Sequence, residues 1–305
     1  MLKTFISAVV CLSISTSTLS QANFKNYEQQ IPGTGMNHRM VAVTGGSFLM
    51  GTPASEPGRD ADEGPQKKVE ISSFWMGAFE VSRDEFDVFY KDESTSQNAP
   101  ADAITRPSPQ YIDFSLGMGK EGGYPVNSLS QYAALMYCRW LYQKTGIFYR
   151  LPTSAEWEYA CRAGSTSTYP FGNDAADLEK YAWYAANSSG TFKKTGQKAP
   201  NAWGLYDMLG NVTEWTIDHY EEDALQRLGD KTKDPMVPFN PMRYPKLLKG
   251  GSYSDDAPQL RSGNRISSDP SWNVRDPQIP KSKWWLTEAG GVGLRVIRPY
   301  LQPSA

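Results

Sequence analysis

The chain has 305 residues, 31 basic and 33 acidic side chains and a formal net charge of −2. So small a charge gives no reason to expect binding to nucleic acid or to an anionic membrane surface. Two histidines are too few for a three-histidine iron or zinc site, and the two cysteines that would remain after removal of an export signal, Cys138 and Cys161, are too few for a cysteine-rich zinc site. Nine tryptophans and 17 tyrosines, with 26 glycines and 21 prolines, predict a loop-rich fold held by aromatic side chains rather than a helical bundle.

The N-terminus has the pattern of an export signal. Lys3 supplies a positive charge, and residues 5–14 form an apolar run that is too short to span a bilayer. Ser20-Gln21-Ala22 places small residues where a signal peptidase reads them. We therefore expect residues 1–22 to be removed, a mature N-terminus at Asn23, and a periplasmic or secreted protein without a membrane span. The alternative is that these residues form the first helix of the folded domain.

The first half of the chain predicts strands followed by a helix. Residues 41–51 (VAVTGGSFLMG) alternate apolar side chains around a glycine pair, which predicts a strand with a bulge. Residues 67–81 predict further strands. Ser82 and Glu85 then have the spacing of a capping box and predict a helix that ends near Lys91. The polar residues 92–124 predict a long loop over the core.

Two more helices are predicted in the centre of the chain. One begins near Ser128 or Ser130 and ends at Gly146, and the other spans residues 154–163 after a capping box. Residues 220–245 predict a surface loop rather than a domain boundary. We expect a single domain over residues 40–300, preceded by an N-terminal extension over residues 23–39.

Several motifs occur in the order found in one enzyme family. They are GGSFLMG, EVSRDEFDVF, YPVNSLSQYAALMYCRWL, YRLPTSAEWEYACRAG, PNAWGLYDMLGNVTEW, KGGSY, RSGNR and the closing GLRV. From about Met40 to Arg298 the chain resembles the sulfatase-modifying factor or formylglycine-generating enzyme family. The resemblance implies an α+β fold, the family's variant of the C-type-lectin-like fold, with little regular secondary structure.

The resemblance also implies bound calcium. Calcium takes six to eight oxygen ligands from carboxylates and carbonyls. In DMLGNVTE the family motif implies side-chain ligands from Asp207 and Glu214 and backbone carbonyls from Gly210 and Val212. The alternative, in which the two acids cap turns, stays open. A second calcium site is implied more weakly by Asn187 and Ser188, because the segment that should carry its later carboxylate is shortened.

The copper site of the family's oxidases is not expected here. In those enzymes the strand after KGGSY carries two cysteines, which bind copper and convert a substrate cysteine to formylglycine. The first position is Asp255 in this chain, the second falls near Gln259 or Leu260, and no cysteine follows Cys161.

The two cysteines that would remain after export match structural cysteines of the family. The partners of those cysteines are replaced near Ser262 and Val296. We interpret Cys138 and Cys161 as buried, weakly polar side chains, although redox catalysis by this pair is the alternative.

The residues that follow the glycine pair of KGGSY, Gly250-Gly251, are polar. Ser252 matches the family's active-site serine, and Asp255 and Asp256 follow it. The sequence therefore predicts an exported, calcium-stabilised protein that binds a peptide or protein, for which an exported sulfatase is one candidate, in the former active-site groove. The alternatives are a peptide-modifying enzyme that uses Ser252, Asp255 and Asp256, and a formylglycine generator that acts by another route.

Overall fold

The structure is a computed structural model that describes residues 24–95, 108, 110–229, 231–240 and 244–300. The expected export signal, residues 1–22, lies outside the described residues. Within these ranges no helix combines the length and the apolar composition needed to cross a membrane. The helices are α2 (Arg83–Lys91), α3 (Gln131–Thr145), α4 (Ser154–Arg162), α5 (Leu178–Tyr181) and α6 (Ala224–Arg227).

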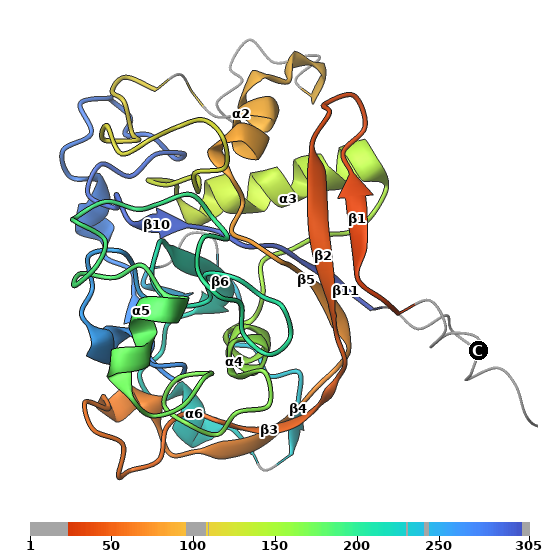
Figure 1. Cartoon of the computed structure of the whole chain (residues 1–305). Coiled ribbons are helices and arrows are strands. Elements are labelled where there is room, and N and C mark those ends of the chain that lie inside the picture. The colour runs from red at the N-terminus through yellow and green to blue at the C-terminus, as the bar shows by residue number, and fades with distance from the viewer. Residues whose placement is uncertain (1–23, 96–107, 109, 230, 241–243, 301–305) are drawn as a thin grey trace, which may run out of the picture.

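The described strands form three small sheets. The strands are β1 (Tyr27–Gln30), β2 (Asn37–Val43), β3 (Gly46–Met50), β4 (Lys67–Ile71), β5 (Phe74–Gly77), β6 (Thr213–His219), β7 (Thr232–Lys233), β8 (Lys246–Lys249), β9 (Ile266–Ser267), β10 (Val292–Gly293) and β11 (Ile297–Pro299). The sheet orders are β1-β2-β5-β11, β10-β6-β8-β9 and β3-β4-β7. Figure 1 shows α3 beside the β1–β2 hairpin, with β3 and β4 at the opposite end. The mixed α+β architecture with little regular secondary structure agrees with the expectation from sequence.

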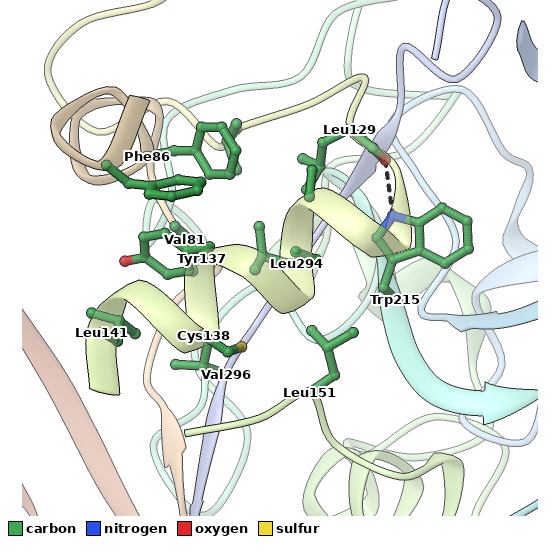
Figure 2. Packing of buried hydrophobic residues seen from close by; sticks show 14 of the residues in the cluster. Val81, Phe86, Leu129, Tyr137, Cys138, Leu141, Leu151, Trp215, Leu294 and Val296 are labelled. Atoms are coloured by element: carbon green, nitrogen blue, oxygen red, sulfur yellow. Dashed lines mark hydrogen bonds between the residues drawn. The ribbon is translucent and has the colours of Figure 1, made fainter. Parts of the chain in front are cut away.

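Helix α3 begins and ends where its sequence predicts. The hydroxyl of Ser130 accepts a hydrogen bond from the amide of Ala133, and Gly146 ends the helix in the left-handed conformation, with φ 70°. One face of α3 packs into a core cluster that also contains Trp215, whose indole donates to the carbonyl of Leu129 at 2.9 Å (Figure 2). This cluster fixes α3 against the sheet that carries the candidate site.

Helices α2 and α4 both have the expected capping boxes. In α4 the hydroxyl of Thr153 accepts from the amide of Glu156 at 3.1 Å, and the Glu156 carboxylate accepts from the amide of Thr153 at 2.8 Å. Every residue of α4 is buried, because the helix contacts β3 and β4 on one side and β6 and β8 on the other. Its buried Glu158 is therefore neutralised by Arg162 and Lys249, at 2.9 and 3.4 Å.

Three expectations about chain organisation were wrong in detail. Residues 41–51 form β2 and β3 in two different sheets instead of one bulged strand. The passage of the chain from one sheet to the other needs glycine at position 45, because a Cβ on Gly45 would lie 2.5 Å from the carbonyl oxygen of Ile71. The expected extension 23–39 contributes β1 and the start of β2 to the first sheet. The expected loop 220–245 contains α6 and β7, and β7 pairs with β4.

Asp218 caps the start of α4 from the neighbouring strand β6. Its carboxylate accepts hydrogen bonds from the amides of Ser154 and Val237, both at 2.7 Å. Burial nevertheless raises the pKa of Asp218 from 3.8 to about 6. The folded state therefore holds this proton more tightly than the unfolded state does.

We expect the Asp218 proton to make stability pH-dependent. Its contribution is present in full below about pH 4 and is lost as the pH rises through about 6. The Asp218→Asn variant cannot titrate, so the unfolding free energy of the wild type minus that of the variant should fall by about 3 kcal/mol over this range. Urea unfolding at a series of pH values measures this difference. A difference that does not change with pH would contradict the assignment.

Candidate functional site

The turn after β8 brings two motifs together. Gly250 and Gly251 have φ values of 100° and 69°, which favour glycine. A Cβ on Gly250 would lie 3.1 Å from the Met208 carbonyl oxygen, and one on Gly251 would lie 3.0 Å from Leu260. The amide of Gly210 donates to the carbonyl of Gly250 at 2.9 Å. The KGGSY turn therefore lies directly against the DMLGN loop.

Ser252 and Asp255 form one hydrogen-bonded unit, as their spacing suggests. The Asp255 carboxylate accepts from the amide of Ser252 at 2.8 Å and from its hydroxyl at 2.9 Å. The Ser252 hydroxyl also lies 3.0 Å from that of Ser254. Asp256 is exposed at the start of a short 3-10 helix and does not join them. The structure thus brings two of the three candidate residues together.

Aromatic and small residues surround this unit. A Cβ on Gly291 would lie 3.0 Å from Ser252, so the chain passes closely on that side. On the other side the ring of Tyr253 meets Phe192 edge to face at 5.8 Å, and Phe192 meets Tyr124 at 6.2 Å. Leu116, which is 49% exposed, lies over Gly290. Ser252 and Phe192 are buried, so the exposed part of this surface consists of Leu116 and the half-buried rings of Tyr124 and Tyr253.

Neither thiol belongs to this surface. Cys138 and Cys161 are free and buried, and they lie in two separate core clusters. Burial raises the pKa of each thiol to about 12, so neither is a thiolate at neutral pH. The sulfur of Cys161 lies 3.8 Å from the hydroxyl of Ser262, one of the two residues expected near the places of the lost partners. The structure agrees with the interpretation of both cysteines as core residues.

A buried cluster of charges lies under the turn. The guanidinium of Arg295 contacts both carboxylate oxygens of Glu214 at 2.7–3.1 Å, and the indole of Trp157 donates to Glu214 at 2.7 Å. Burial, with the charges of Asp207 and Glu214, raises the pKa of Glu80 well above its ordinary value. Three acids and one guanidinium leave this cluster with an excess of carboxylates.

The two side chains expected to bind calcium, Asp207 and Glu214, differ in how many hydrogen bonds they already accept. Asp207 accepts from the amide of Gly196 through one oxygen at 2.6 Å, while its other oxygen is buried without a hydrogen bond to any described residue. Burial raises the pKa of Asp207 to about 6. An unsatisfied buried carboxylate oxygen is the feature that a hard cation would satisfy. Glu214, in contrast, already accepts two donors at each oxygen. Asp207 therefore fits calcium better than Glu214 does.

The weaker pair, Asn187 and Ser188, holds a turn together. The Asn187 side chain accepts from the amide of Tyr184 at 3.0 Å and donates to the carbonyl of Ala182 at 3.0 Å. The Ser188 hydroxyl donates to the carbonyl of Tyr253 at 2.7 Å. These contacts stabilise the turn next to Ser252. They give no support to the second calcium site, which stays a prediction.

Two residues of the buried cluster were missed by the sequence analysis. Glu80 accepts from the side chain of Asn211 at 2.7 Å and from the amide of Val212 at 3.0 Å, so it fixes the DMLGN loop. The signal for Glu80 is an acid inside an otherwise apolar strand-to-helix segment, MGAFEV. Arg295 lies in the closing GLRV motif, but its pairing with Glu214 has no local signal.

Comparisons with known proteins find one family model and relatives that carry more than one name. A family model described as sulfatase-modifying factor enzyme 1-like domain matches residues 26–276. The formylglycine-generating enzyme of Bos taurus is 29% identical over 259 residues, which cover 70% of this chain and 66% of that one. The Bos taurus protein named inactive C-alpha-formylglycine-generating enzyme 2 is 28% identical over 229 residues, 62% of this chain and 73% of that one. This chain therefore spans about two thirds of the length of the bovine enzyme.

Solved structures show the same fold. PvdO from Pseudomonas aeruginosa matches with a TM-score of 0.69 and 26% identity, over 90% of this chain and 98% of that chain. The Treponema denticola variable protein 1 matches with a TM-score of 0.66 at 20% identity, over 90% of this chain and 99% of that chain. The expected fold, the formylglycine-generating-enzyme variant of the C-type-lectin-like fold, is confirmed.

Proposed function

Because the chain belongs to the sulfatase-modifying factor enzyme 1-like family, we propose that it is an exported, calcium-stabilised member that binds a peptide or protein beside Ser252. Copper–thiol oxidation is not part of this function. The N-terminal pattern that ends at Ser20-Gln21-Ala22 supports export to the periplasm or the medium. An exported sulfatase is one candidate partner.

One observation supports the proposed loss of the oxidase chemistry. Asp255, which the family resemblance implies at the position of the first copper-binding cysteine, is hydrogen-bonded to Ser252. Leu260, near the second position, is buried, and the two thiols of the mature chain lie in the core. A carboxylate and a hydroxyl are hard ligands, which do not suit copper(I). The relative named as inactive supports the existence of such members in the family.

Catalysis without thiols is the second candidate function. The Ser252 hydroxyl donates to Asp255 at 2.9 Å, and such a contact can orient a hydroxyl for reaction with a bound peptide. In this alternative the protein is a peptide-modifying enzyme of the same family, acting on sulfatases or on another exported peptide. It predicts a chemical change in the ligand, which binding alone does not.

A peptide-binding experiment separates these functions. We expect a fluorescent peptide with the cysteine-containing sulfatase motif to bind the mature protein and to keep its mass in the presence of copper and oxygen. Asp255→Asn removes the charge that holds Ser252, so it should weaken binding, whereas the exposed Asp256→Asn should not. Anisotropy and mass spectrometry measure the two effects. Copper-dependent conversion of the peptide would refute the proposal, and a copper-independent mass change that requires Asp255 would favour the alternative.

The proposed calcium is held by Asp207 with the backbone carbonyls of Gly210 and Val212. The buried oxygen of Asp207 that lacks a hydrogen bond supports this choice, as does the excess of carboxylates around it. Glu214, expected as a fourth ligand, instead balances Arg295 in this arrangement. The cation would neutralise the acids and stabilise the loop beneath Ser252.

Removal of calcium should therefore lower the melting temperature. A cation that binds only the folded state stabilises it by about 2.7 kcal/mol at a hundredfold excess over its dissociation constant. EDTA should remove this stabilisation and added calcium should restore it in the wild type. Asp207→Asn should abolish the response to calcium, and Glu214→Gln should keep it. A melting temperature that does not change with EDTA would show that Asp207 holds its turn without binding calcium.

A further inference from the structure

We infer that the ligand of this surface is an acidic peptide, whose carboxylates are bound by Lys193, Lys194 and Lys198. This inference rests on the proposed function, because it concerns the same surface, and it adds the class of peptide. The three lysines lie within residues 193–198 of a chain whose acids outnumber its bases.

The three lysines form no close ion pairs with the described residues. Where the structure describes the chain, none of their ammonium groups forms an ion pair with a carboxylate. Lys193 donates to the hydroxyl of Thr191 at 2.6 Å, and Lys198 donates to the carbonyl of Glu179. The buried Lys249, by comparison, is paired with an acid. Burial lowers the pKa of Lys198, while the nearby charges of Glu179 and Asp207 raise it. The charge of Lys198 is therefore compensated in part, whereas Lys193 and Lys194 form no ion pair in the described fold.

Aromatic rings hold these lysines in place. The ammonium groups of Lys198 and Lys193 lie 3.9 and 5.9 Å from the centre of the same ring, that of Trp183. Lys194 lies 5.5 Å from the ring centre of Tyr124. Cation–π contacts of this kind restrict the side chains without neutralising their charge. The lysines are thus ordered before a ligand arrives, which lowers the entropy lost on binding.

The lysine segment is joined to the Ser252 turn. The amide of Lys193 donates to the side chain of Asn211 at 2.8 Å, and Asn211 accepts from the amide of Tyr253 through its carbonyl at 2.8 Å. The rings of Tyr124, Phe192 and Tyr253 form a continuous row between Lys194 and Ser252. A ligand that extends from Ser252 across Tyr124 therefore reaches Lys194 first, and the same segment carries Lys193 and Lys198 over the ring of Trp183.

The two kinds of side chain on this surface indicate a pattern in the ligand. Alternate residues of an extended peptide point to opposite sides, so a peptide can present carboxylates and apolar groups on its two faces. Carboxylates would face the lysines, and apolar side chains would face Tyr253 and the exposed Leu116. Complementary charge would also speed the encounter, since unpaired lysines attract anions from a distance.

The test uses two matched peptides. One alternates Asp and Leu, and the other alternates Asn and Leu, so they differ in charge but closely resemble each other in shape. We expect the acidic peptide to bind the mature protein at least about tenfold more tightly at low salt, since three partly exposed pairs contribute up to about 1 kcal/mol each. This preference should shrink at high salt.

The variants compare two sets of lysines. The combination Lys193→Gln, Lys194→Gln and Lys198→Gln should remove the preference for the acidic peptide. The control combination Lys67→Gln, Lys68→Gln and Lys233→Gln removes three lysines of the β3-β4-β7 sheet that also lack ion pairs in the described structure, and it should keep the preference. Melting temperatures verify that both variants are folded.

The outcomes separate the inference from the proposed function. If the wild type binds both peptides equally and the Lys193–Lys198 variant behaves like the wild type, the inference is wrong and the peptide-binding function stands. If neither these peptides nor the sulfatase peptide binds, the proposed function fails and the inference fails with it. Lysines and aromatic rings can also bind single-stranded nucleic acid. Lysine-dependent binding of a single-stranded oligonucleotide, without binding of the acidic peptide, would therefore overturn the inference.

Discussion

Replacement of Arg295 with methionine should lower the free energy of unfolding by about 3–5 kcal/mol, the usual loss when one partner of a buried ion pair is removed. Arg295 is fully buried and contacts Glu214 at 2.7 Å. Without it, Glu214 would be a buried charge with only Trp157 as a hydrogen-bond donor. Burial and the neighbouring acids already raise the pKa of Glu80, so this cluster disfavours an unpaired carboxylate. Urea unfolding in the presence of EDTA measures the loss without any contribution from calcium.

Two further variants test this reason. Arg298→Met changes an arginine on β11 that contacts the ring and hydroxyl of Tyr27 and forms no ion pair with the described carboxylates, so its effect should be much smaller. Adding Glu214→Gln to Arg295→Met removes the stranded charge and should recover part of the loss. Equal effects of Arg295→Met and Arg298→Met, or no recovery in the double variant, would contradict a role for charge.

The ends of the main helices could be predicted because their signals are local. The capping box of Ser82 and Glu85 satisfies the first amides of α2 within one turn of chain. Thr153 and Glu156 do the same for α4. Gly146 ends α3 because its left-handed conformation is easiest for glycine. None of these helix ends depends on the segment against which the helix packs.

The path of the chain between sheets could not be predicted in the same way. Apolar residues alternate on both sides of Gly45-Gly46, so the pattern is the same for one bulged strand and for two strands in different sheets. What decides between them is the approach of Ile71 to Gly45, a contact between segments far apart in sequence. The pairing of β7 with β4 is likewise long-range and has only two residues on each strand.

The candidate site was predictable only where its partners are close in sequence. Ser252 and Asp255 are three residues apart, and their contact follows from the turn. Asp256 was expected with them, but successive side chains diverge and it is exposed. Glu214 and Arg295 are 81 residues apart, and only the fold brings them together.

Ser262→Cys should create a disulfide with Cys161 and stabilise the mature protein. The hydroxyl of Ser262 lies 3.8 Å from the Cys161 sulfur, and both side chains are buried. The two positions are 101 residues apart. In the chain-entropy description, closing a loop of this size removes about 4–5 kcal/mol of unfolded-state freedom, before any strain in the folded state is subtracted. An exported protein would meet the oxidising conditions that the bond needs.

Thiol titration and thermal unfolding together decide this prediction. The oxidised variant should retain one free thiol, that of Cys138, and should melt above the wild type. Reduction should return its melting temperature to that of Ser262→Ala, which keeps the side chain small and cannot form the bond. Because the bond would lie in the α4 core and not beside Ser252, peptide binding should be unchanged. Three free thiols in the unfolded, air-oxidised variant would show that Cys161 and residue 262 do not approach each other as the structure places them.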